Sequence, residues 1–485
     1  MVLELILSLV TNDSVKARSV VELTTNKYFQ RSWSSVYRAI ENFYCARDES
    51  LNIRDEQRFK TREDIEKYLI SKLINEGKNL LQIDTTVSSK KDSKKAIDRT
   101  YIRQNANNRP VAGYEYSVVC IGAQPKWSVP ISINRVKSDE NKYSKGSKQI
   151  MKIVKQIPQK ALNITVGDAG YSALSFIHPL HNEANTVTIT RQRINRSIYK
   201  IYIEEQKTRG RKRSYGAKIS CSSSDNLLIP DTAETVVKAT KNGDISISIS
   251  LFKNYLIKGK KQHIMSDKPL NFIQVKVLDA SGNRKYNRDL WLCVSGQQKD
   301  KISGKEVYEY YRQRFDIEHF FKFGKSKLLM DKFQTNDPNK DEDYMLFVML
   351  AYNILYHAQS SVKARKVRAW DKKINSNMLS PSEVYRSMPQ IALEEILEKS
   401  VSRGIPDHRN IRNNHQVKPF APVIRKSNKH GKLEITIKSS FDGSNQITKT
   451  SFNKKLELPN NISKYKPAIL DKIATVFDTL CTQIE

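Results

Sequence analysis

Residues 310–325 read YYRQRFDIEHFFKFGK and carry the most informative pattern in the chain. This stretch lies in a segment, Lys305 to about Asp331, whose pattern predicts one long helix. Four of its polar residues fall at roughly 0°, 300°, 340° and 320° around the axis of an α-helix: Tyr311, Arg314, Glu318 and Lys325. A stripe ~60° wide therefore carries an aromatic hydroxyl, two cations and a carboxylate, with Lys322 close by.

This charged stripe has two interpretations. Arg314, Glu318 and Lys322 could form ordinary salt bridges four residues apart on a solvated face. However, other sides of the helix carry apolar residues that predict a largely buried helix: Phe315, Ile317, Phe320 and Phe321. Buried charges need a partner such as a metal or a phosphate. We therefore expect Glu318 to bind metal, and Arg314 and Lys325 to bind phosphate oxygens.

Two short strand patterns upstream each stop at an aspartate. Asn79 to Asp84 and Asn163 to Asp168 are mostly apolar runs, so each carboxylate is expected at the edge of a buried strand. A lone aspartate in such a place is more often a turn or cap residue. Asp92 and Asp98 are alternatives for the first position, but they follow polar, Lys-rich sequence.

The order of the predicted elements indicates the fold class. Strands at 79–84, 114–122 and 127–136, a helix at 147–159, further strands at 163–168 and 186–190, and later the long helix are the order of a ribonuclease-H-like α/β core. That fold would bring Asp84, Asp168 and Glu318 together. Three carboxylates meet at low cost only around cations. Two Mg²⁺ ions about 3.5–4 Å apart, which Mn²⁺ could replace, would suit these oxygen ligands.

Five regions are expected along the chain. They are a helical DNA-binding domain at 1–75, the first part of the core at 76–193, a β-rich insertion at 194–286, the second part of the core at 287–360, and a C-terminal region at 361–485. Within the first, residues 19–43 form two short helical patterns. They fit either a helix-turn-helix that points Arg38 at DNA or an ordinary helical hairpin.

Charge indicates the kind of partner. Lys and Arg number 83 against 51 Asp and Glu, a net charge of +32. An excess of that size favours a polyanion, with nucleic acid the best fit and a ribosome-associated or merely soluble basic protein the alternative. Residues 207–218 hold six basic residues in twelve, a further candidate DNA contact or simply a basic loop, among them Arg209, Arg211, Lys212 and Arg213. Trp291 could stack on a base but fits the core better, and His319 fits a structural role.

The remaining composition points to a soluble cytoplasmic protein. The five cysteines are scattered without the close spacing of a zinc or redox motif. The apolar runs fall short of the ~20 residues that span a bilayer. The N-terminus lacks the basic region and cleavage site of a secretory signal.

The spacing Tyr311-x2-Arg314-x3-Glu318-x6-Lys325 resembles the YREK signature of bacterial insertion-sequence transposases of the DDE group typified by insertion sequence 4. VGDAGYS at 166–172 and LLQIDTT at 80–86 are similar to the blocks around that family's first two catalytic aspartates, and the likeness spans roughly residues 15–360. The resemblance implies Asp84, Asp168 and Glu318 as metal ligands, and Tyr311, Arg314 and Lys325 as contacts to the cleaved DNA end.

The resemblance also implies a reaction and an assembly. Cut-and-paste transposition would begin with hydrolysis at the element's inverted-repeat ends and continue with strand transfer by the 3′-OH into target DNA. A homodimer on double-stranded DNA, associated with the bacterial nucleoid in the cytoplasm, is expected. Two alternatives stay open: another nuclease of the ribonuclease-H fold, and a transposase-derived DNA-binding protein that has lost catalysis.

Overall fold

The computed structural model describes residues 2–29, 31–41, 51–103, 110–124, 127–193, 195–203, 213–221, 229–239, 243–359, 362, 379–395, 423–429 and 432–438. The α-helices are α1 (Val2–Val10), α2 (Ser34–Glu41), α3 (Leu51–Leu73), α4 (Lys142–Val154), α5 (Leu174–His181), α6 (Gly304–Gln313), α7 (Asp316–Lys327), α8 (Pro338–Ala358) and α9 (Pro381–Glu395). Three short 3₁₀ helices are η1 (Val21–Thr25), η2 (Gly170–Ser172) and η3 (Lys299–Lys301).

The strands are β1 (Lys78–Ser89), β2 (Thr100–Arg103), β3 (Pro110–Gln124), β4 (Trp127–Val136), β5 (Leu162–Gly167), β6 (Thr186–Arg191), β7 (Ser197–Tyr199), β8 (Lys218–Ser220), β9 (Thr232–Lys238), β10 (Ile245–Tyr255), β11 (Leu270–Leu278), β12 (Leu290–Ser295), β13 (Val423–Lys429) and β14 (Lys432–Lys438). Among the described residues, twelve of them form one mixed sheet. Its order is β14-β13-β2-β3-β1-β5-β6-β12-β11-β10-β9, with β4 paired to β3.

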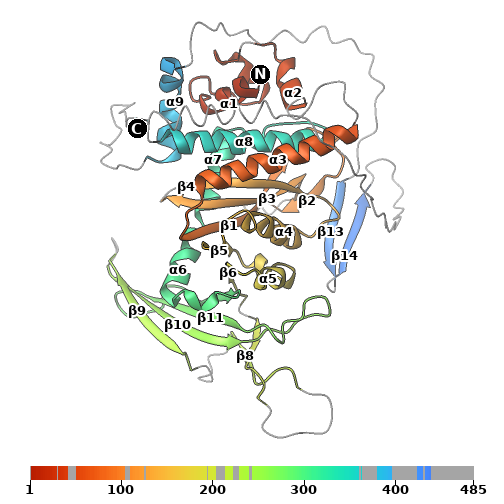
Figure 1. Cartoon of the computed structure of the whole chain (residues 1–485). Helices are drawn as coiled ribbons and strands as arrows, with labels where there is room; N and C mark the ends of the chain where they lie inside the picture. Colours follow the sequence, from red (N-terminus) through yellow and green to blue (C-terminus); the bar gives the residue numbers. More distant parts are fainter. Residues whose placement is uncertain are drawn as a thin grey trace.

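The centre of the sheet has the arrangement that the element order predicts. β1 pairs antiparallel with β3 and parallel with β5, and β5 pairs parallel with β6. Helices α4 and α5 pack together on one side, while α7 and α8 pack on β4 (Figure 1). The large mixed sheet with helices is consistent with a ribonuclease-H-like domain.

The strands from the predicted β-rich insertion extend the same sheet. β12 pairs antiparallel with β6, and β11, β10 and β9 follow it outward. In Figure 1 they curve away below the core, and α6 lies against them. One hydrophobic cluster joins this extension to the central strands through Ile164, Val187, Ile249 and Val307. The extension is thus built onto the core through shared apolar side chains.

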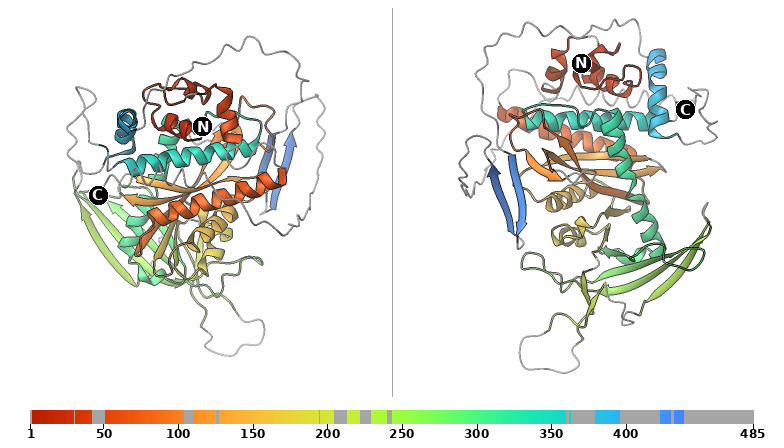
Figure 2. Two further views of the ribbon diagram at one scale, coloured as in Figure 1. Left: turned by 45° about the horizontal axis from the view of Figure 1, so that its top comes forward. Right: turned by 180° about the vertical axis from the view of Figure 1, so that it is seen from behind.

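The N-terminal helices belong to the main hydrophobic cluster. Leu5 and Leu9 of α1 and Val36 and Ile40 of α2 are fully buried in it together with residues of α8. Figure 2 shows α1 and α2 beside α8 from two further directions. The pattern that suggested a helix-turn-helix forms η1 and α2, so its first part is a 3₁₀ helix.

Buried ion pairs join α3 and the end of β1 to α8. Lys90, which follows β1, donates to Asp341 on α8, and both side chains are fully buried. Arg58 Nε on α3 lies 2.6 Å from Asp343 Oδ1, and Arg62 Nη1 lies 3.0 Å from Glu342 Oε1. Because an unpaired buried charge is costly, these pairs fix α8 in register with its neighbours.

Several predicted boundaries are wrong for local reasons. The helix expected at 147–159 is α4, which begins earlier because Asn141 caps it by accepting from Tyr143 N (2.9 Å) and Ser144 N (3.2 Å). The single helix expected at 305–331 is two helices, α6 and α7. Helices α5 and α9 were not predicted. In the C-terminal region the sequence also predicts a hairpin near 432–448 and a helix at 466–483. The hairpin lies at 423–438, and 466–483 lies outside the described residues. None of the described helices combines the length and apolar composition that crossing a bilayer requires.

Candidate active site

Asp84 and Asp168 lie on adjacent parallel strands. The register pairs Leu80 with Ile164 and Gln82 with Val166, a constant offset of 84 residues. Continued by two residues, it places Asp84 beside Asp168, which directly follows β5. Neighbouring strands are about 4.7–4.9 Å apart, so the two carboxylates share one edge of the site.

Asp84 does not end its strand as predicted. β1 continues to Ser89 because the antiparallel pairing with β3 persists after the pairing with β5 has stopped at Gln82. The Asp84 side chain is 20% exposed, and its Oδ1 accepts from Thr85 N at 2.7 Å. The carboxylate therefore emerges where only one neighbouring strand remains paired.

A tight turn fixes Asp168. Its Oδ1 accepts from Gly170 N at 2.8 Å and from Tyr171 N at 3.3 Å. A Cβ added at Gly170 would lie 2.5 Å from the Tyr143 hydroxyl and 3.1 Å from Asp168 Oδ1. A larger residue at this position would require the Tyr143 side chain to move, which the glycine two residues after the aspartate avoids.

Arg314 links the strands to the helix that carries Glu318. Its Nη1 lies 3.6 Å from Asp84 Oδ2 and its Nη2 lies 3.3 Å from Glu318 Oε1. The guanidinium is buried, 5.8 Å from the centre of the Tyr311 ring and 4.2 Å from that of Phe315. The structure thus brings Tyr311, Arg314 and Glu318 together with the first aspartate.

The break between α6 and α7 falls at Arg314 and Phe315. The backbone tightens there, since Arg314 N bonds Tyr311 O at 3.2 Å and Glu318 N bonds Phe315 O at 3.0 Å. Gln82 Nε2, on β1, donates to the freed Gln313 carbonyl at 2.7 Å. The uniform helical stripe predicted from the sequence is therefore wrong across the break, and Phe315 is 50% exposed instead of buried.

Gln82 is a site residue that the sequence reasoning missed. It is fully buried, and its Oε1 accepts from Ser128 Oγ while its amide holds the helix break. A buried amide inside the apolar run LLQIDTT, two residues before Asp84 and on the same face of the strand, is the signal that could have revealed it.

Burial and neighbouring charges raise the pKa of Asp84 to about 6. Burial is the largest cause, the Thr85 backbone hydrogen bond and Arg314 oppose it, and Asp168 and Glu318 add to it. The three carboxylates are thus close enough to repel one another. Burial also raises the pKa of Tyr311, against the nearby cations Arg314 and Arg191.

Further cations surround Asp168. Lys142 Nζ lies 2.8 Å from Glu115 Oε1, and its pKa is raised because these acidic neighbours outweigh its burial, with Asp168 contributing. Burial raises the pKa of Tyr143, and the cations Lys142 and Arg193, the latter just past β6, oppose that rise. Lys142 and Arg193 stand outside any sequence motif, so no pattern in the sequence indicated them.

The other predicted contacts are spread over the molecule. Glu318 is 54% exposed at its side chain, Lys322 is exposed, and Lys325 is partly buried with a lowered pKa due to burial. Arg38 on α2 and Arg213 in the segment before β8 are exposed, whereas Arg209, Arg211 and Lys212 lie outside the described residues.

The alternatives raised from the sequence can also be placed. Asp98 accepts from Arg135, and Asp92 is exposed in the loop after β1. Trp291 is buried and stacks on Phe252 at 5.6 Å, as predicted for a core residue. His319 is exposed, so it contributes little to the core.

The donor set of Asp84, Asp168 and Glu318 fits a divalent cation that prefers oxygen, such as Mg²⁺. Burial and the neighbouring carboxylates raise the pKa of Asp84, so a cation bound beside it would favour its ionised form. In the part of the chain that the structure describes, no three His, Cys, Asp or Glu side chains converge closely enough to hold an ion as they stand. Arg314 supplies the cation between Asp84 and Glu318 in this state.

A comparison with models of protein families gives a match for this chain. Residues 83–354, more than half of the chain, match the family described as transposase DDE domain. A search of curated proteins found no match. The match begins one residue before Asp84 and includes Asp168 and Glu318. This chain therefore belongs to the transposase DDE domain family.

Proposed function

We propose that this protein is a metal-dependent DNA transposase of the YREK group that cuts and rejoins DNA by a cut-and-paste route. The observation that carries the proposal is the convergence of Asp84, Asp168, Arg314 and Glu318 from two strands and a helix far apart in the sequence. The net charge of +32 supports DNA as the partner.

Asp84, Asp168 and Glu318 would hold the metal ions, with Mg²⁺ or Mn²⁺ as candidates. Bound there, two such ions would activate the attacking oxygen and stabilise the leaving oxygen of a phosphodiester. Glu318 is largely exposed and is held by one 3.3 Å contact to Arg314, so its side chain has space to turn toward the aspartates. Arg314 would then be released to a phosphate oxygen.

Two chemical steps follow in the proposal. Water attacks a phosphorus atom at the element's inverted-repeat end, the bond to the 3′ oxygen breaks, and a free 3′-OH and a 5′-phosphate result. That 3′-OH then attacks a phosphorus in target DNA, forming a new phosphodiester and displacing the target's 3′ oxygen. Tyr311, beside Arg314, would orient the DNA end, and a homodimer would pair the two ends.

Incubation of the protein with DNA that carries its gene and flanking sequences, with Mg²⁺ or EDTA, tests the proposal. We expect Mg²⁺-dependent nicks at the borders of inverted repeats, followed by joining to a target plasmid. Glu318→Gln should abolish nicking but retain end binding, whereas Glu309→Gln, an exposed residue of α6, should behave as wild type.

Other outcomes separate the alternatives. Nicking without joining, and without preference for the repeat ends, would assign a different nuclease of this fold. Binding to the ends without nicking under any divalent metal would assign a DNA-binding protein that has lost catalysis.

A further inference from the structure

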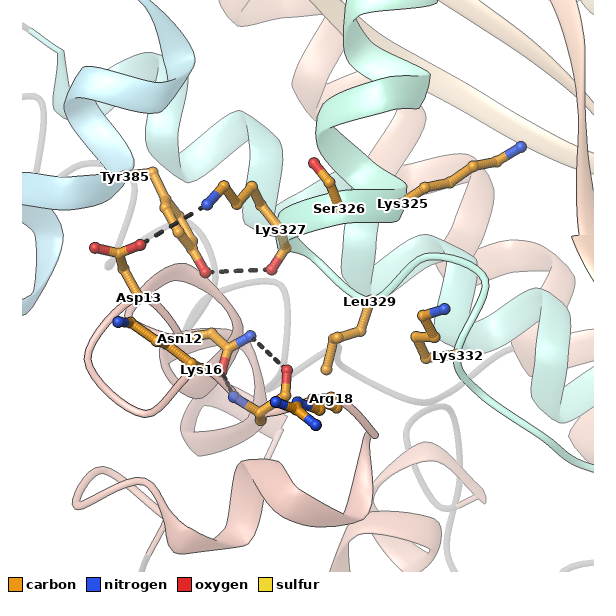
Figure 3. A pocket seen from close by; sticks show the side chains of 11 residues that line it. Asn12, Asp13, Lys16, Arg18, Lys325, Ser326, Lys327, Leu329, Lys332 and Tyr385 are labelled. Atoms are coloured by element: carbon orange, nitrogen blue, oxygen red, sulfur yellow. Dashed lines mark hydrogen bonds and ion pairs between the residues drawn. The ribbon is translucent and has the colours of Figure 1, made fainter. Parts of the chain in front are cut away.

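A basic pocket lies between the N-terminal region and the end of α7 that is distant from Glu318. Its volume is about 420 Å³, and its lining residues are Asn12, Asp13, Lys16, Ala17, Arg18, Lys325, Ser326, Lys327, Leu329, Lys332 and Tyr385. Figure 3 shows the loop of residues 12–18 on one side and the end of α7 with the following turn on the other. We call it the Lys16 pocket.

The charges in the Lys16 pocket are unbalanced. Five cationic side chains line it against one carboxylate, that of Asp13, which lies 3.9 Å from Lys327 Nζ. Lys16 and Arg18 are exposed, and neither forms a side-chain ion pair with any residue that the structure describes. Lys332 Nζ also lies 3.7 Å from Asp331 Oδ1, but the cations still outnumber the carboxylates, so the pocket favours a bound polyanion.

The wall that carries Lys16 and Arg18 is rigidly built. Asn12 is buried, and its side chain bonds Ala17 twice, accepting from Ala17 N at 2.8 Å and donating to Ala17 O at 3.3 Å. Lys16 has a φ of 58°, a left-handed conformation that this closed loop imposes. Two cations are therefore presented from either side of a buried alanine.

The opposite wall is fixed to the helix that carries Glu318. The Tyr385 hydroxyl of α9 donates to Lys327 O at 3.2 Å, which holds the end of α7 in place. Lys325 lines the pocket and also belongs to the motif that contains Glu318. Lys325 lies seven positions after Glu318, which is about 10 Å along a helix.

We propose that the Lys16 pocket binds backbone phosphates of the DNA duplex whose cleaved end occupies the active site. The proposal rests on the proposed function and adds a site to it. With an axial rise of about 3.4 Å per nucleotide, the bound phosphates lie about three nucleotides or more from the scissile phosphate. Lysine and arginine contacts to phosphates set position without reading sequence. The pocket thus positions the duplex by joining the N-terminal region to the catalytic helix.

The salt dependence of DNA binding tests this proposal. The double variant Lys16→Asn, Arg18→Ala removes two pocket charges, and asparagine tolerates the left-handed backbone at position 16. Binding to a mixed-sequence duplex is measured by fluorescence anisotropy over a range of salt concentrations. The logarithm of the binding constant falls as log salt rises, and each lost phosphate contact makes this slope less steep by about 0.9. The double variant should therefore make the slope less steep by about 2 and weaken binding at least about ten-fold at 0.1 M salt.

Two further variants make the test specific. Lys332→Ala, on the opposite wall, should make the salt slope less steep by about 1. The control Lys155→Ala, Lys160→Ala removes the same charge from exposed positions after the C-terminal end of α4, whereas the N-terminal end of that helix lies near Asp168. It should leave the slope unchanged. Thermal unfolding of each variant shows that the fold is retained.

The outcomes separate this proposal from the proposed function. An unchanged slope in both pocket variants, with wild-type nicking at the repeat ends intact, would overturn the pocket and leave the transposase. A salt slope made equally less steep in the pocket and control variants would also overturn the proposal, because DNA binding would then follow net charge alone. Failure of the wild-type protein both to bind DNA and to nick it would overturn both proposals.

Discussion

Replacing Asp84 with asparagine should stabilise the metal-free protein while abolishing its chemistry. The pKa of Asp84 is raised from an ordinary 3.8 to about 6, so the folded state binds the proton more tightly than the unfolded state. Stability associated with this group therefore falls as pH rises from about 4 to 6 and stays low above 6. At 1.36 kcal/mol per pKa unit, the ionised carboxylate costs about 3 kcal/mol, reduced to about 1–3 kcal/mol by its partial exposure to water.

Asparagine resembles the protonated acid and removes this cost. We expect Asp84→Asn to exceed the wild type in free energy of unfolding by about 1–3 kcal/mol at pH 8 and by nearly nothing at pH 4. Urea unfolding in EDTA at the two pH values measures the difference. Asp92→Asn is the control, since Asp92 is exposed in the loop after the same strand.

Addition of metal should reverse the order of stabilities. A ligand that binds only the folded state stabilises it in proportion to the logarithm of its concentration above Kd. Mg²⁺ should therefore raise the unfolding midpoint of the wild type and leave that of Asp84→Asn unchanged. A gain in the variant that is equal at pH 4 and pH 8 would refute the electrostatic reasoning, and an Mg²⁺ effect of equal size in both proteins would refute the assignment of Asp84 as a ligand.

Three other substitutions test how the fold supports the site. Gln82→Leu removes the hydrogen bond to the Gln313 carbonyl at the helix break, so the nicking rate should fall about ten-fold or more with DNA affinity retained; an unchanged rate would show that the break is held without it. Asp341→Asn leaves Lys90 buried without its counterion and should cost about 3–5 kcal/mol in urea unfolding, whereas replacing both residues with apolar ones should recover most of the loss. Gly170→Ala pushes a methyl group toward the Tyr143 hydroxyl in the turn that follows Asp168, so Mg²⁺-dependent nicking should fall while the thermal unfolding midpoint changes little. A large drop in the midpoint together with the loss of nicking would indicate a general folding defect.

Much of the local structure could be predicted from the sequence. The strands that lead to Asp84 and Asp168 and the apolar faces of α2 and α4 follow from the periodicity of side chains along one segment. Helix boundaries were less accurate, because they depend on single polar contacts that the apolar pattern does not record. These are the cap at Asn141 and the hydrogen bond from Gln82 to the Gln313 carbonyl.

The sequence alone identifies candidate site residues: two aspartates after apolar runs, one glutamate in a motif with Tyr311, Arg314 and Lys325, and a large excess of positive charge. The tertiary structure alone decided how these residues meet. It placed Arg314 between two carboxylates, joined the β-rich segment to the sheet through β12, and set Lys16 against the end of α7. The physical reason is that periodicity records the exposure of one segment at a time, whereas contacts between distant segments depend on how all of them pack.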